Sequence, residues 1–113
     1  MVYKHIVMWK FKEQHNGKSA LENARWMKEQ LEGLVGVVPE LLSAEVGISP
    51  ALEQAAAAPA PAASGEYDAC LISAFASPEA LAAYKVHPKH KAISAYCKEA
   101  RLKRLAFDWW SEE

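Results

Sequence analysis

The hydrophobic and polar positions near the start of the chain predict a β-strand. Residues 2–11 are rich in β-branched and aromatic side chains, the types that strands favour. Side chains alternate between the two faces of a strand, so one face would hold Tyr3, His5, Val7, Trp9 and Phe11. The opposite face would hold Val2, Lys4, Ile6, Met8 and Lys10. Neither set is consistently polar, so we expect a strand covered on both faces, with helices over the face that holds His5, Val7 and Trp9 and something else over the other.

A helix is predicted after the turn signal Asn16-Gly17. Ser19 and Glu22 have the spacing of a capping box, in which each side chain bonds the other residue's exposed backbone amide. Apolar residues then recur at steps of three and four, at Leu21, Ala24, Met27, Leu31 and Leu34. This period gives an amphipathic helix with one apolar stripe, and Gly33 is available to end it.

The middle of the chain contains two further predicted strands separated by a low-complexity segment. Apolar and polar residues alternate over residues 41–48 and again over residues 67–75. The segment between them is rich in alanine, but Pro59 and Pro61 deprive a helix of backbone donors. We therefore interpret residues 50–66 as a flexible Ala/Pro-rich loop.

The last third of the chain predicts a broken helix and a closing strand. Ser77-Pro78-Glu79 combines an N-cap serine, a proline at the first helical position and an acid near the positive helix end. Because Pro88 disfavours helical dihedrals at the preceding residue, we expect a break and a second helical segment over residues 89–100. A strand over residues 102–110 completes the order βαββαβ. This order predicts an α+β, ferredoxin-like fold for residues 1–113, with helices on one face of a four-stranded antiparallel sheet.

Composition and charge limit the partners. A chain of 113 residues, 51% hydrophobic and with four Trp, has more large apolar side chains than one small core needs, which favours a subunit interface. A net charge of −1 gives no general attraction to nucleic acid or membranes. Residues 29–84 contain acids but no Lys or Arg, whereas residues 85–104 are strongly basic. Three explanations remain open: two solvated faces, complementarity between subunits, or steering of an anionic ligand.

We expect a cytoplasmic protein. The amino terminus has no apolar stretch behind a basic one, as a signal peptide would. No run approaches the roughly 20 apolar residues of a membrane span.

Six segments, in order, resemble the stress-responsive dimeric α/β-barrel family. They are Lys4–Lys12, Gly36–Pro39, Tyr67-Asp68, Phe75–Tyr84, His87-Pro88-Lys89-His90 and Phe107-Asp108-Trp109. The resemblance implies a homodimer in which two sheets pack face to face into a barrel. It also implies a small-molecule pocket between sheet and helices in each protomer.

The same resemblance indicates candidate site residues. In a polyketide cyclase of that family, the tyrosine before the His-Pro-x-His turn acts together with the second histidine of the turn. These positions match Tyr84 and His90, and a first-strand histidine matches His5. A neutral His90 in the first turn of a helix could accept a proton, Tyr84 could donate a hydrogen bond to a developing oxyanion, and His5 could orient the substrate. We expect Val7, Trp9, Met27 and Ile93 to contact the ligand.

Two function classes therefore remain open. One is a dimeric ligand-binding protein of unspecified activity, in which His87 and His90 only cap backbone groups at the turn. The other is a cofactor-free acid–base enzyme, cyclase-like or monooxygenase-like, acting on a small carbonyl compound. We expect no cofactor and no metal site, because His90 with His87 or Cys97 lacks a third ligand at a recognisable spacing.

Overall fold

The computed structural model of the protein describes residues 1–57 and 65–112. The elements in chain order are β1 (Val2–Phe11), β2 (Gln14–His15), β3 (Lys18–Ser19), α1 (Ala20–Glu32), β4 (Ser43–Ile48), α2 (Pro50–Ala57), β5 (Ala69–Phe75), α3 (Pro78–Val86), α4 (Pro88–Ala100) and β6 (Arg101–Ser111). Within the described residues, no helix is long and apolar enough to cross a membrane.

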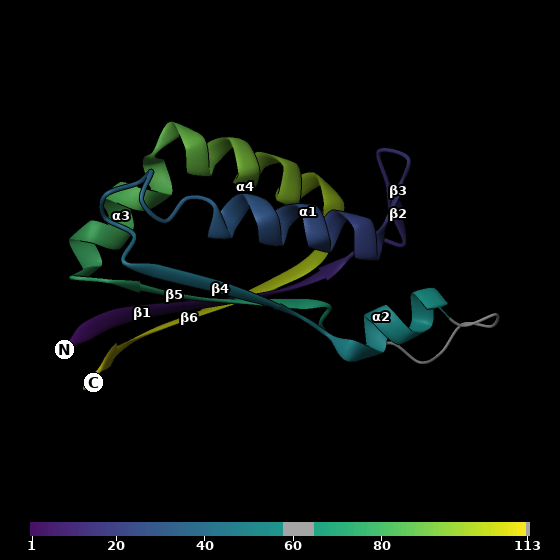
Figure 1. Cartoon of the computed structure of the whole chain (residues 1–113), viewed down its shortest axis with the longest axis horizontal. Helices are drawn as coiled ribbons and strands as arrows, with labels where there is room; N and C mark the ends of the chain where they lie inside the picture. The colour runs from purple at the N-terminus through teal and green to yellow at the C-terminus, as the bar shows by residue number, and fades with distance from the viewer. Residues whose placement is uncertain (58–64, 113) are drawn as a thin grey trace.

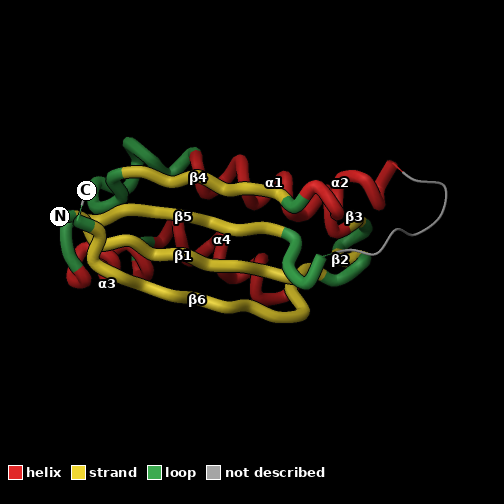
Figure 2. The backbone as a smooth tube through the Cα atoms, turned by 90° about the horizontal axis from the view of Figure 1, so that it is seen from below, coloured by secondary structure: helices red, strands yellow, loops and turns green. Residues whose placement is uncertain are grey.

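The main sheet has the strand order β4-β5-β1-β6, and every neighbouring pair is antiparallel. Helices α1, α3 and α4 form a second layer on one face (Figure 1). Viewed from below, the other face of the sheet has no helix across it (Figure 2). The predicted ferredoxin-like α+β fold is confirmed.

The core lies between the sheet and the helix layer. The β1 residues predicted to face the helices are buried from His5 to Phe11, whereas their even-numbered neighbours are half-buried. Large side chains from β1, α1 and β5, including Val7, Met27 and Phe75, are at most 2% exposed. Strand β1 is therefore the centre of the fold, and the side chains of its inner face lie under the helices.

The predicted helix boundaries follow their capping residues. The Ser19 hydroxyl accepts a hydrogen bond from the Glu22 amide, and the Glu22 carboxylate accepts one from the Ser19 amide, so the capping box is complete. Helices α3 and α4 are separated at His87, whose backbone is extended at φ −64° and ψ 133°. The His87 ring nitrogen then accepts a hydrogen bond from the Lys89 amide at 3.1 Å and caps the start of α4.

Two segments differ from the prediction. The first part of the predicted loop is a helix, α2, because the Ser49 hydroxyl accepts a bond from the Ala51 amide and Pro50 occupies the first helical position. Leu52 of this helix is buried against the core. The remainder of the predicted loop, residues 58–64, lies outside the described residues.

The Asn16-Gly17 turn also closes a short hairpin, β2–β3, which the prediction had only as a turn. Both turn residues have positive φ, 57° and 73°, as a tight two-residue hairpin turn requires.

Candidate functional site

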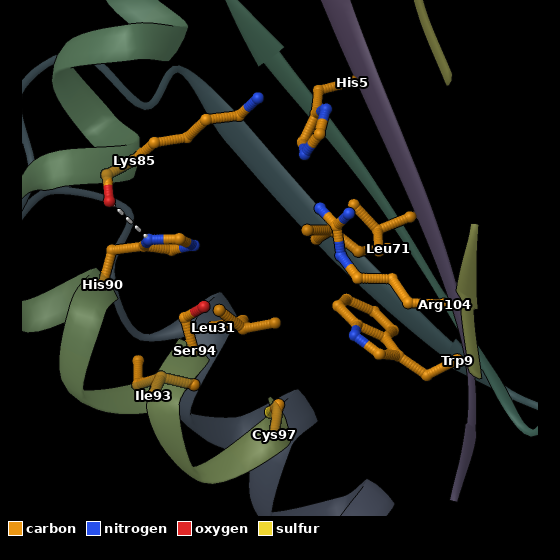
Figure 3. A pocket seen from close by; sticks show the side chains of 11 residues that line it. His5, Trp9, Leu31, Leu71, Lys85, His90, Ile93, Ser94, Cys97 and Arg104 are labelled. Carbon is orange, nitrogen blue, oxygen red and sulfur yellow. Dashed lines mark hydrogen bonds between the residues drawn. The ribbon is translucent and has the colours of Figure 1, made fainter. Parts of the chain in front are cut away.

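A cavity of about 240 Å³ opens between the sheet and the helix layer. Its lining comes from β1, α1, β5, α3, α4 and β6, and consists of His5, Val7, Trp9, Leu31, Leu71, Lys85, His90, Ile93, Ser94, Cys97 and Arg104 (Figure 3). Aliphatic and indole groups form much of its surface, and the ionisable groups His5, Lys85, His90 and Arg104 surround them.

The His90 imidazole is held in one tautomer. Its Nδ1 lies 3.2 Å from the Lys85 carbonyl oxygen. A carbonyl can only accept, so Nδ1 carries the hydrogen and Nε2 of the neutral ring keeps a lone pair. The other ring nitrogen points into the cavity (Figure 3). Burial lowers the pKa of His90, the bond to the Lys85 carbonyl opposes this effect, and electrostatic interactions with His5, Arg104 and Lys85 lower the pKa further. The ring is therefore neutral near pH 7.

His5 is oriented in the same way by a carboxylate. The antiparallel register places Asp108 of β6 directly opposite His5 of β1, and His5 Nδ1 lies 2.5 Å from Asp108 Oδ1. Burial lowers the pKa of His5, and this effect outweighs the hydrogen bond and charge of Asp108, which raise it. His5 thus presents a second imidazole to the cavity, and the Asp108 carboxylate fixes the orientation of its ring.

Tyr84 lies beside His90 but not in the cavity wall. The centroids of the two rings are 4.3 Å apart, and Phe75 packs on the Tyr84 ring at 5.1 Å. The Tyr84 hydroxyl is buried and has no hydrogen-bond partner in the described part of the chain. Burial raises the pKa of Tyr84, so the phenol stays protonated at working pH. The break at Pro88 brings the Tyr84 and His90 rings together. The lining does not include Tyr84, so the predicted role of its hydroxyl as a donor to a substrate oxyanion does not fit the cavity.

The residues predicted to contact a ligand divide into two groups. Val7, Trp9 and Ile93 line the cavity. Met27 does not line it, because its side chain is 0% exposed within the core beneath α1. Leu31, one turn further along the same apolar stripe, reaches the cavity instead.

Other chemistry is less favourable at this site. Burial raises the pKa of the Cys97 thiol to about 12, so this sulfur is not a ready nucleophile near neutral pH. Across residues 1–57 and 65–112, no group of three or more His, Cys, Asp or Glu could hold a metal ion. The two fixed imidazoles are the groups best placed to accept protons.

The family of the chain follows from a sequence comparison. The model of the stress responsive A/B barrel domain family, Dabb, matches residues 3–111, nearly the whole chain. The protein belongs to the Dabb family. No curated protein matches the chain.

Solved structures share the Dabb fold at low sequence identity. A dimeric protein of unknown function from Bacteroides fragilis, described as ferredoxin-like, is 23% identical over 97% of this chain and 96% of its own, with a TM-score of 0.76. A hydroxynitrile lyase from Passiflora edulis is 18% identical over 99% and 95%, with a TM-score of 0.71. The cofactor-independent oxygenase SnoaB from Streptomyces nogalater is 4% identical over 99% and 94%, with a TM-score of 0.68. One fold therefore hosts proteins with different described activities.

Sequence reasoning missed three polar groups of this Dabb site. Asp108 belongs to a segment that resembles the family, but it received no role. Its signal was the antiparallel pairing of the first and last strands, which sets it opposite His5. Lys85 and Arg104 were visible only as members of the basic segment. Their positions in the cavity depend on how α3 and β6 pack around β1.

Proposed function

We propose that this Dabb protein is a homodimer whose sheet–helix cavity binds a small organic molecule and catalyses proton transfer on it. One observation supports the catalytic part of the proposal most directly. Two imidazoles line one cavity, and each has its Nδ1 committed to a fixed acceptor, the Lys85 carbonyl for His90 and the Asp108 carboxylate for His5. A neutral imidazole held in this way has a lone pair on Nε2 for a substrate proton.

The proposed step is removal of a proton from a carbon next to a carbonyl group. His90 Nε2 takes the proton, the electrons of the C–H bond form a carbon–carbon double bond, and the electrons of the C=O π bond move onto the oxygen, which gives an enolate. His5, held by Asp108, accepts a hydrogen bond from a substrate hydroxyl at Nε2 and so orients the substrate. Tyr84 packs against the His90 ring, and we assign it as a positioning residue.

The dimer proposal rests on the outer face of the sheet. No helix covers that face (Figure 2). Apolar side chains remain exposed on it, among them Ile72 at 42% and Phe107 at 63%. Val2, Ile6 and Met8 on the same face are half-buried. Exposed apolar patches of this kind are typical of protein interfaces, and the Bacteroides fragilis neighbour is described as dimeric. A second copy, sheet against sheet, would close the two halves into a barrel.

A generic carbon acid tests the catalytic part without knowledge of the natural substrate. In 5-nitrobenzisoxazole, removal of the ring C–H proton breaks the N–O bond and releases a coloured cyanophenolate. We expect the full-length protein to accelerate this reaction and His90→Gln to lower the rate by roughly 10²–10⁴, the usual contribution of a positioned base. His15→Gln is the matched control, because His15 lies in the β2–β3 hairpin and not in the cavity lining.

Two results would contradict this function. One is no acceleration by the wild-type protein over free imidazole at the same concentration. The other is equal loss of rate in His90→Gln and His15→Gln, which would indicate that any histidine on the protein suffices.

A further inference from the structure

Two cationic side chains in the cavity wall have no part in the proposed proton transfer. Lys85 belongs to the last turn of α3, and Arg104 belongs to the edge strand β6. Figure 3 shows their charged ends extended from opposite walls toward the space beside His5. Across the described residues, neither side chain makes an ion pair within 4.0 Å.

No acid in the lining balances these charges. Among the described residues that line the cavity there is no Asp or Glu. Asp108 is the nearby carboxylate, and it is bonded to His5. Burial lowers the pKa of Arg104 and Arg101 lowers it further, while Asp108 opposes both. A partly desolvated guanidinium and an ammonium beside two imidazoles would be stabilised by a negative charge between them.

The rest of the lining limits the body of the ligand. Val7 and Leu71 present aliphatic groups from adjacent strands, and Trp9 adds an indole ring. Such a surface suits a hydrocarbon or aromatic group rather than a bare inorganic anion. The polar requirement is in the space beside His5, where the planar Arg104 guanidinium matches a carboxylate and the Lys85 ammonium adds a point charge from the opposite wall.

We propose that the cavity is selective for a small organic carboxylate, held by Lys85 and Arg104 with its apolar body against Val7, Leu71 and Trp9. This inference rests on the proposed function only in placing the ligand in the same cavity. Carboxylate recognition uses Lys85 and Arg104, whereas proton transfer uses His90, so the two can fail separately.

The test compares two probes of nearly equal shape by calorimetry on the full-length protein. Phenylacetate has the carboxylate, and 2-phenylacetamide replaces it with a neutral amide. We expect phenylacetate to bind about a hundredfold more tightly, because each of the two cations contributes the equivalent of about one charge-assisted hydrogen bond. Lys85→Met and Arg104→Met should each weaken phenylacetate binding by about tenfold and leave amide binding unchanged. Lys91→Met is the control, because Lys91 is an exposed residue of α4 outside the lining.

Arg104→Lys separates charge from shape, and it should recover only part of the lost affinity, because lysine lacks the planar fork. Equal affinity for the two probes, or equal losses for both probes in Lys85→Met and Arg104→Met, would overturn the proposal. Inorganic phosphate that binds as tightly as phenylacetate would also overturn it, since the site would then recognise charge alone. If the protein showed no carboxylate selectivity but kept its His90-dependent rate, the proposed function would still hold and only the ligand class would be refuted. Carboxylate selectivity with a rate that does not depend on His90 would support the ligand class and refute the base.

Discussion

Replacing Tyr84 by Phe removes one oxygen atom from the core, and we expect the protein to become more stable. The Tyr84 side chain is 1% exposed, and its hydroxyl has no hydrogen-bond partner in the described part of the chain. In the unfolded chain, water satisfies this hydroxyl, so folding forfeits a hydrogen bond. The contacts of the ring with Phe75 and His90 do not depend on the oxygen.

The magnitude follows from the cost of a buried polar group without a partner, about 1–3 kcal/mol. We take the lower end, so Tyr84→Phe should raise the free energy of unfolding by about 1 kcal/mol. For a chain of this size that corresponds to a rise of about 4 °C in Tm. Urea unfolding at a fixed protomer concentration measures the change, because a dimer's apparent stability depends on concentration.

The chain offers a matched control with the opposite sign. The Tyr96 hydroxyl donates a hydrogen bond to Asn23 Oδ1 at 2.6 Å, and Asn23 is itself buried. Tyr96→Phe removes the same atom but leaves a buried acceptor unsatisfied, so it should destabilise the protein by about 1–2 kcal/mol. If Tyr84→Phe destabilised the protein as Tyr96→Phe does, the Tyr84 hydroxyl would have a partner and the reasoning would be wrong.

The same variant tests the assignment of Tyr84 as a positioning residue. Because the hydroxyl is not in the cavity lining, Tyr84→Phe should keep the 5-nitrobenzisoxazole rate within about threefold, far less than the 10²–10⁴ expected for a proton-transfer group. A loss as large as that of His90→Gln would instead make the hydroxyl a catalytic donor.

Two further predictions concern pH and assembly. Burial lowers the folded-state pKa of both His5 and His90 from 6.5. Below pH 6.5 the unfolded chain therefore binds more protons than the folded protein. The stability should be full above pH 6.5 and should fall as the pH drops through the folded pKa values. Thermal melts at pH 7.5 and 5.5 measure this loss of stability, which should be smaller in the His5→Gln/His90→Gln double variant. An equal loss in the double variant would refute the assignment of the pH dependence to these two histidines. Ile6→Asp would bury a carboxylate in the proposed sheet-to-sheet interface and weaken the dimer by about a thousandfold, the equivalent of about 4 kcal/mol. Sedimentation velocity should then show that the Ile6→Asp protein is monomeric. The control Val86→Asp, at an exposed position on α3, should remain dimeric. A dimeric Ile6→Asp protein would place the interface elsewhere.

Local sequence signals predicted most of the secondary structure because their causes are local. The Ser19–Glu22 capping box, the Ser77-Pro78 start and the break before Pro88 each act within one helical turn. Alternation along residues 2–11 likewise identified the buried face of β1. The prediction was wrong at α2. It relied on Pro59 and Pro61, which come after the last residue of the helix, and it gave no weight to Ser49 and Pro50, which favour a helix start.

What the sequence by itself determined was the order of elements and the inner face of β1, and the family resemblance implied the pairing of Tyr84 with His90. Only the tertiary structure decided which side chains share the cavity. Strand pairing joined His5 to Asp108 across 103 residues, and the packing of α3 and β6 brought Lys85 and Arg104 to opposite walls. It also left Met27 in the core and the Tyr84 hydroxyl without a partner. Periodicity fixes the face on which a residue lies, but register and helix packing fix its neighbours, and these depend on contacts between distant parts of the chain.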